Sequence, residues 1–164
     1  MKRTACRGLT LIELAITLAL MALLAVLAVP SMGAQLDQRR LTAAAEALTA
    51  DLGEARFEAA NQGRSISLLV QGGAHWCWSV ATSTACPCGQ RQACELRSSS
   101  VSNHGVVQML QGQSLLLTPT GAAQAAGAIT LESRRGARLR VQLQALGRPH
   151  ICAELGPTNR YPPC

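Results

Sequence analysis

The cysteines have the most distinctive chemistry in this sequence. Seven are present. One, Cys6, precedes a long apolar run, and the other six follow that run. An even number of cysteines in a small domain beyond an apolar segment is typical of disulfides formed in an oxidising compartment. Six cysteines allow many pairings, and the sequence does not choose among them. The disulfide candidates are Cys77, Cys86, Cys88, Cys94, Cys152 and Cys164.

Part of this set also resembles a metal site. Cys86-Pro87-Cys88, Cys94 and Cys77 stand close in sequence to His75. Structural zinc sites usually place about two to four residues between paired ligands. Here one residue separates Cys86 from Cys88, and five separate Cys88 from Cys94. Disulfides are the simpler interpretation, and we expect neither a metal nor a cofactor.

No arrangement of residues indicates an enzyme. The histidines His75, His104 and His150 stand in no sequence setting that suggests a Ser-His-Asp triad. The glycines are dispersed turn residues and form no phosphate-binding loop. We therefore expect a binding or structural protein.

Positive charge collects near the C-terminus. The net charge is +6, and between Ser133 and Cys164 the only acidic residue is Glu154. A cationic patch can attract nucleic acid or anionic lipid. The alternative is a solvated strand face and loop. The arginines concerned are Arg134, Arg135, Arg138, Arg140, Arg148 and Arg160.

One carboxylate stands inside an apolar run. Leu9–Val29 contains 21 residues and a single charge, Glu13. As a helix the run is about 31 Å long, which matches a bilayer core. The run is too long for an ordinary secretory signal, and Cys6 stands on the wrong side of it for a lipoprotein signal. A simple membrane anchor would not explain Glu13, which costs several kcal/mol in lipid without a partner.

The charges that flank the run predict its orientation. Lys2, Arg3 and Arg7 precede it without any acidic residue. Such a basic flank stays in the cytoplasm. We therefore expect a single-pass inner-membrane protein whose C-terminal domain is periplasmic.

The segment Arg7-Gly8-Leu9-Thr10-Leu11-Ile12-Glu13 resembles the signal of type IV prepilins and pseudopilins. The resemblance implies that a prepilin peptidase cleaves between Gly8 and Leu9 and methylates the new amino group of Leu9. Glu13 then becomes the fifth residue of the mature chain, and Pro30 the twenty-second. Both residue types are usual in the family at those positions. Phe is commoner than Leu at the position of Leu9.

Physical chemistry suggests an assembly role for Glu13 and Pro30. The freed amine of Leu9 is a cation, so Glu13 of one subunit can pair with this amine on a neighbour, or with its own amine while the subunit waits in the membrane. Such pairing favours assembly in a fixed axial register. Pro30 removes a helix hydrogen bond and should bend or loosen the helix. The alternative for Pro30 is a helix end at the membrane surface.

Beyond Pro30 the apolar period is helical and then changes to that of strands. Leu41, Leu48 and Leu52 share one helical face with Ala44, Ala55 and Ala59, and Asn61-Gln62-Gly63 favours a helix end. This predicts an α+β fold in which a long N-terminal helix packs on a small antiparallel sheet. The expected regions are a leader 1–8, a transmembrane and assembly helix 9–29, an amphipathic continuation 30–63 and a disulfide-bonded domain 64–164.

Three hairpins are expected in the C-terminal domain. Arg138–Gln144 alternates strictly, so one of its faces should be solvated and cationic. The segment Ala81–Asn103 is expected to be an irregular loop held by disulfides. The strand pairs of the hairpins are Ser65–Val70 with Trp76–Ala81, Val106–Leu110 with Ser114–Thr118, and Ala128–Glu132 with Arg138–Gln144.

The C-terminal half resembles the FimT/GspH group of minor pilins and pseudopilins. In that group a Pro-x-Gly turn precedes a hairpin, and a Gly-Arg motif follows the last strand. The corresponding residues are Pro119-Thr120-Gly121 and Gly147-Arg148-Pro149-His150. The resemblance implies a subunit that primes or caps a type IV pilus or a type II secretion pseudopilus. The implied partners are prepilin peptidase, other minor and major pilins or pseudopilins, and the inner-membrane assembly platform.

A second function follows from the same motif. Some FimT-type minor pilins bind DNA through a Gly-Arg-x-Arg motif, and this chain has His150 in place of the second arginine. Histidine is only partly charged near neutral pH. Any DNA binding should be weak, independent of sequence and sensitive to salt. The candidate contacts are Gly147, Arg148, His150, Arg138 and Arg140.

Overall fold

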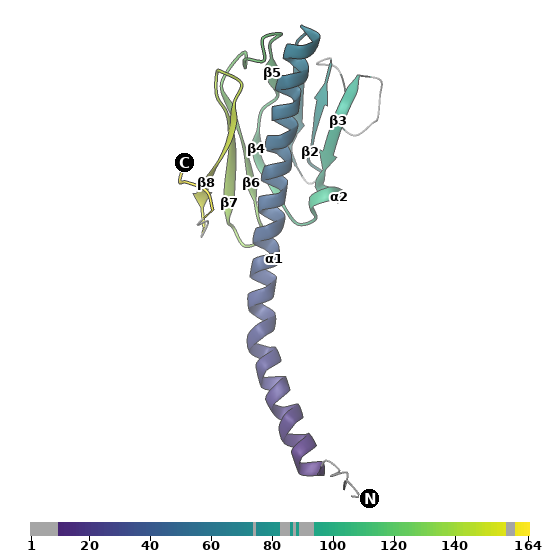
Figure 1. Ribbon diagram of the computed structural model, residues 1–164, viewed down its shortest axis with the longest axis vertical. Helices are drawn as coiled ribbons and strands as arrows, with labels where there is room; N and C mark the ends of the chain where they lie inside the picture. Colours follow the sequence, from purple (N-terminus) through teal and green to yellow (C-terminus); the bar gives the residue numbers. More distant parts are fainter. Residues whose placement is uncertain (1–9, 74, 83–85, 87, 89–93, 157–159) are drawn as a thin grey trace, which may run out of the picture. The chain divides into compact units, whose positions relative to one another are not determined.

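The computed structural model describes residues 10–73, 75–82, 86, 88, 94–156 and 160–164, without the side chains of 27–31. The chain forms two compact units, Met1–Leu36 and Asp37–Cys164. The α+β class is confirmed (Figure 1). The elements are α1 (Leu11–Gln62), β1 (Ile66–Gln71), β2 (Cys77–Ala81), β3 (Glu95–Ser100), α2 (Val101–His104), β4 (Gln108–Gly112), β5 (Leu115–Leu117), β6 (Gly127–Glu132), β7 (Arg138–Leu143) and β8 (Pro149–Leu155).

The predicted stop after α1 is confirmed. Gly63 has φ 62°, a left-handed conformation that glycine adopts without strain. The N–H of Arg64 then donates to the carbonyl of Ala59 at 3.3 Å. This is the six-to-one bond of a Schellman motif, which satisfies a helix carbonyl that would otherwise lack a partner.

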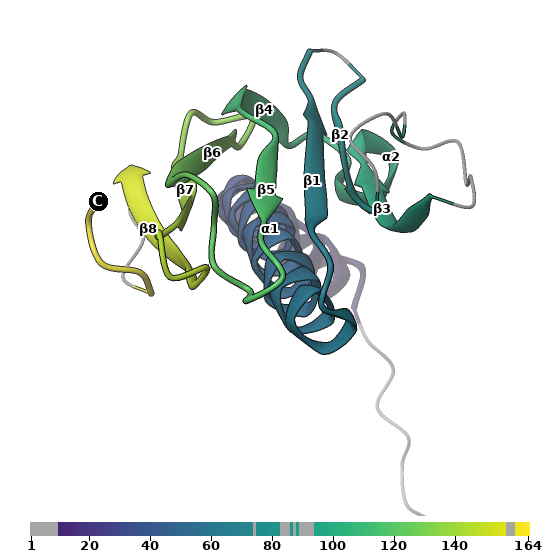
Figure 2. The same cartoon turned by 90° about the horizontal axis from the view of Figure 1, so that it is seen from above.

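The strands of the Asp37–Cys164 unit form two sheets rather than the single sheet expected. Within the described residues, the strand orders are β3-β2-β1-β5 and β4-β6-β7-β8. Every pairing between these neighbours is antiparallel. Figure 2 shows the strands arranged in an arc around α1, with β8 at one end and β3 at the other.

One expected hairpin is wrong. β4 and β5 are consecutive in sequence, but β4 pairs with β6 and β5 pairs with β1. The chain therefore passes from one sheet to the other at Gln113-Ser114. Alternation predicts that two segments are strands, but it does not identify their partners. The other two hairpins, β1–β2 and β6–β7, are confirmed.

Two strands and a short helix lie where none was expected. β3 and the start of α2 occupy the supposed loop Ala81–Asn103. β3 buries little of its surface, so its sequence lacks the alternation that marks a half-buried strand. β8 begins at Pro149, so the Gly-Arg motif does not follow the last strand as expected.

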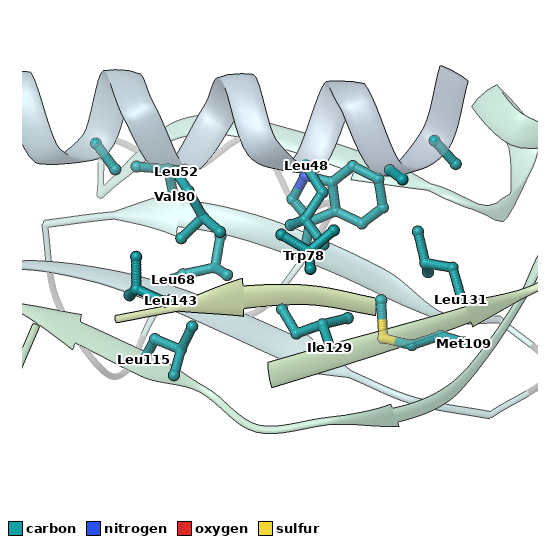
Figure 3. Close-up of a cluster of buried hydrophobic side chains, with 14 of the residues drawn as sticks. Leu48, Leu52, Leu68, Trp78, Val80, Met109, Leu115, Ile129, Leu131 and Leu143 are labelled. Carbon is teal, nitrogen blue, oxygen red and sulfur yellow. The ribbon is translucent and has the colours of Figure 1, made fainter. Parts of the chain in front are cut away.

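The core lies between α1 and the sheets. Figure 3 shows Leu48 and Leu52 of α1 facing Trp78 and side chains from both sheets. Leu48, Leu52 and Trp78 are completely buried. Burying a side chain of this size contributes about 2–3 kcal/mol. The predicted helical face is thus confirmed, and Asp51 of the same helix is also buried, with 7% of its surface exposed.

Candidate functional site

The predicted N-terminal processing site lies outside the described residues, which begin at Thr10. Gly8 and Leu9 are not described, and α1 begins at Leu11. The N–H of Glu13 donates to Oγ1 of Thr10 at 3.3 Å, and the N–H of Leu14 donates to the carbonyl of Thr10 at 3.1 Å. Thr10 therefore caps the helix. Glu13 lies in its first turn, where the negative charge of a carboxylate interacts favourably with the helix dipole. Sequence reasoning missed the Thr-x-x-Glu pattern, which is a recognisable capping signal.

The first turns of α1 present apolar side chains on every side. Ten large apolar residues between Leu11 and Val26 are 52–86% exposed. Thr17 satisfies its own hydroxyl by donating to the carbonyl of Leu14 at 2.8 Å. Within the described residues, no helix combines the length and apolar character needed to cross a membrane. A soluble monomer rarely exposes so much contiguous apolar surface, which therefore marks an interaction surface.

Pro30 does not end the helix. α1 continues through this position to Gln62, so the alternative of a helix end there is wrong. The side chain of Pro30 lies outside the described residues, and the expected bend stays a prediction.

The six disulfide candidates form three pairs. Cys77 bonds to Cys88 and Cys86 to Cys94, so two bridges hold the connection between β2 and β3. Cys152 in β8 bonds to Cys164 at the C-terminus. These bridges close loops of 8–12 residues, and each should stabilise the fold by about 2–3 kcal/mol. The cysteines of the zinc alternative are consumed by these bonds, so they have no thiolates for a metal.

Close packing explains why glycine stands at Gly121 of the Pro-x-Gly turn and at Gly147 of the Gly-Arg motif. Gly147 lies in the turn between β7 and β8 with φ 73°, and a Cβ at this position would stand 1.9 Å from the carbonyl oxygen of Gly121. Gly121 has φ 76°, and its own missing Cβ would meet Arg56 of α1 at 3.1 Å. The two turns therefore stack on each other and on the helix. This contact fastens the β7–β8 turn to the chain between β5 and β6.

The C-terminal arginines are mostly paired with carboxylates. Arg138 lies 3.0 Å from Glu132, and Arg140 forms an ion pair with Glu154. Arg135 pairs with Asp37, and Arg160 with Glu46. The alternation of β7 is confirmed, but its outer face is not the solvated cationic face expected, because neighbouring strands supply acids to it.

The DNA-contact candidates do not form one cationic surface. Arg148 is exposed, whereas His150 is half-buried in β8 opposite Gln142. The Nδ1 atom of His150 is buried and has no hydrogen-bond partner among the described groups. Arg138 and Arg140 lie on β7 in the ion pairs above. Of these four side chains, only Arg148 is a freely exposed cation.

A comparison with protein-family models decides the family. The model described as type II transport protein GspH matches residues 44–147. The chain belongs to the GspH family. A second model, the prokaryotic N-terminal methylation motif, matches residues 3–29. The GspH match extends to Gly147, so it includes both of the stacked glycine turns.

Solved structures show the same fold. This GspH-family chain is similar to two crystal forms of the type IV minor pilin FimU from Pseudomonas aeruginosa PAO1, with 21% identity to each. The first match has a TM-score of 0.51 and covers 72% of this chain and 90% of FimU. The second has a TM-score of 0.52, with 70% and 93% covered. No curated protein matches the chain.

Sequence reasoning missed a polar network that is centred on the buried Asp51 of this GspH-family domain. Asp51 of α1 accepts a hydrogen bond from Nε1 of Trp78 at 2.7 Å and pairs with Arg97 of β3 at 3.4 Å. Arg97 also pairs with Glu54 at 2.7 Å. The network joins the helix to the otherwise little-buried β3. Its only sequence signal was a pair of acids at positions 51 and 54 of the helix.

The ring of His104 packs beside the network of Asp51, Trp78 and Arg97. The ring of His104 stacks on Trp78 and Trp76, with ring centroids 5.4 and 5.9 Å apart. Its Nε2 atom lies 2.9 Å from Oγ of Ser99. Burial lowers the pKa of His104, and the nearby Asp51 carboxylate opposes this shift. The ring is therefore mainly neutral near pH 7.

Proposed function

We propose that the chain is a minor pilin or pseudopilin of a bacterial type IV filament system. It inserts in the inner membrane through residues 9–29, with the GspH-family domain in the periplasm, and joins other subunits to prime or cap a filament. The observation that carries the proposal is the N-terminal methylation motif, placed on a helix whose apolar side chains are exposed. Lipid before assembly, and neighbouring helices after it, are environments that cover such a surface.

In this proposal, the chain joins a filament only after its N-terminus has been processed. Prepilin peptidase removes residues 1–8 and methylates Leu9. The cation at Leu9 then pairs with Glu13 of a neighbour, which compensates the cost of a carboxylate in an apolar environment. The first-turn position of Glu13 supports this arrangement, because it keeps the carboxylate near the helix start.

The deciding experiment is intact-mass measurement of the membrane-derived chain. The expected mass corresponds to a chain that begins at methylated Leu9 and contains three disulfides. A Gly8→Val variant should keep residues 1–8, because the resemblance to prepilins implies cleavage directly after this glycine. A wild-type chain that still begins at Met1 when the peptidase is present would contradict the proposal.

Both filament systems remain candidate assemblies. The family model carries the name of a type II transport protein, and the similar solved structure is a type IV minor pilin. We infer a minor pilin of FimT type as the leading form, with the H-type pseudopilin as its alternative. Crosslinking from the mature helix in the native membrane, followed by mass spectrometry of the partner, distinguishes them. Pilins as partners support the first form, and secretion pseudopilins support the second.

DNA binding is the alternative function, and the ion pairs weigh against it. Arg138 and Arg140 are neutralised by Glu132 and Glu154. The remaining candidate cation, Arg148, should retain DNA only weakly. A gel shift at low salt, wild type against Arg148→Ala, tests this alternative. Equal mobility of DNA with wild type and with the variant would contradict DNA binding as a function. A shift that wild type causes and the variant does not would support it.

A further inference from the structure

One end of the Asp37–Cys164 unit collects arginines from separate elements. Arg39 and Arg40 lie near the start of this unit's part of α1, and Arg134 and Arg135 lie in the β6–β7 turn. Arg135 pairs with Asp37 at 3.4 Å, which places that turn beside the start of the unit. Arg39, Arg40 and Arg134 are exposed. None of these three has an ion pair with another described residue.

Two open hollows meet at this end around Gly105. The larger, of about 560 Å³, is lined by Arg134 and by the apolar side chains of Trp76, Val101, Val107 and Met109. The smaller, of about 320 Å³, is lined by Arg40, Ala43, Ser102, Asn103 and His104. Gly105 lines both. We call the two together the Arg40–Arg134 groove.

The groove offers hydrogen-bond donors without a carboxylate among its lining residues. Oδ1 of Asn103 accepts bonds from the N–H and the hydroxyl of Ser100 at 3.1 and 3.2 Å, so its amide N–H groups stay available as donors. The guanidinium of Arg40 supplies further donors beside them. Arginine is well suited to phosphate, since its planar fork can bind two oxygens at once.

The chain length limits how far this end can lie from a membrane. Ten residues lie between Val29 and Arg40, and even a fully extended chain of this length reaches at most about 40 Å. Resting on the proposed membrane insertion, we propose that the Arg40–Arg134 groove binds the phosphate headgroups of anionic phospholipids. The groove thereby holds the domain on the periplasmic leaflet before the subunit is extracted into a filament. Basic clusters next to a membrane helix gain favourable energy from anionic lipid in this way.

The test uses the mature full-length chain in lipid nanodiscs. Hydrogen exchange of residues 99–109 and 133–137 is compared between discs of phosphatidylcholine alone and discs that contain phosphatidylglycerol. We expect exchange slower by about tenfold with phosphatidylglycerol, and loss of this difference in high salt. The variant Arg40→Ala/Arg134→Ala should lose the slowing. The control Arg64→Ala/Arg148→Ala removes the same charge from two exposed arginines outside the groove and should retain the slowing.

Each other outcome overturns the inference. Equal exchange in the two kinds of disc, from a chain that has entered both, overturns the lipid contact and leaves the proposed function intact. Slowing by inorganic phosphate in phosphatidylcholine discs assigns the groove to a free anion. Slowing that needs an added pilin partner assigns it to a protein contact. A mature chain that does not enter the discs overturns the membrane part of the proposed function and this inference with it.

Discussion

Gly147 illustrates how a single missing side chain can join distant turns. Its position requires both a left-handed backbone and empty space, because the carbonyl of Gly121 fills the site of a Cβ. Gly136 provides a matched control, since it has φ 83° with no atom within 4 Å of its missing Cβ.

Gly147→Ala should lower the free energy of unfolding by about 2–5 kcal/mol, whereas Gly136→Ala should cost only about 1–2 kcal/mol. Denaturant unfolding of the full chain in detergent measures both, and equal losses would contradict the packing argument.

At the same scale, His104 should make stability depend on pH. Its folded pKa lies below the usual histidine value of about 6.5, chiefly because of burial. Below about pH 6.5 the unfolded chain therefore binds a proton that the folded chain resists. The free energy of unfolding should fall as pH decreases through this window and be fully restored above it. Unfolding at pH 5 and pH 7.5 should show a smaller difference in His104→Gln than in wild type. An equal difference in His104→Gln and in wild type would contradict this prediction.

Among the elements, β8 is the edge strand whose outer side receives the C-terminal tail. The N–H of Ala153 donates to the carbonyl of Pro162 at 2.8 Å, and the N–H of Cys164 donates to the carbonyl of Ala153 at 3.1 Å. Tyr161 donates to Glu46 of α1 at 2.7 Å, and the disulfide from Cys152 closes the segment. Covering an edge strand in this way prevents unwanted strand pairing.

The Cys152–Cys164 bridge should therefore stabilise both the tail and the edge of the sheet. Cys152→Ser/Cys164→Ser should lower the free energy of unfolding by about 2–3 kcal/mol and should speed exchange of the backbone N–H groups of Ala153 and of position 164. The control Cys86→Ser/Cys94→Ser removes a bridge at the other sheet, so it should leave exchange at Ala153 unchanged. Protection of Ala153 that survives loss of the first bridge would show that the hydrogen bonds alone hold the tail.

At the scale of the whole molecule, the two units differ in what covers their apolar surface. The Asp37–Cys164 unit encloses a core, whereas the described residues of the first unit expose twelve large apolar side chains and contain no buried one. The apolar side chains of the first unit therefore need lipid or other subunits to cover them.

Glu13→Leu should leave the unfolding of the domain unchanged and reduce crosslinking of the helix to other pilins several-fold. Thr17→Leu is the control, because its hydroxyl is satisfied within the helix. Undiminished crosslinking in Glu13→Leu would refute the pairing of Glu13 with a neighbour.

The sequence by itself determined the local features of this protein. The spacing from Gly8 to Glu13, the helical face that contains Leu48 and Leu52, the stop at Gly63 and two of the hairpins all follow from interactions between residues close in the chain. Such interactions repeat with a short period, so a pattern predicts them. It was likewise predictable that the six cysteines form disulfides, but not which cysteine bonds to which.

The tertiary structure alone decided which distant segments meet. It separated β4 from β5, paired the cysteines, buried Asp51 under Trp78, neutralised the arginines of β7 and brought Arg40 and Arg134 to one end. Strand alternation shows which face is buried but not which strand lies alongside. A charged residue has no period that identifies its partner. These contacts depend on how the helix and two sheets share a single core, which is a property of the whole fold rather than of any segment.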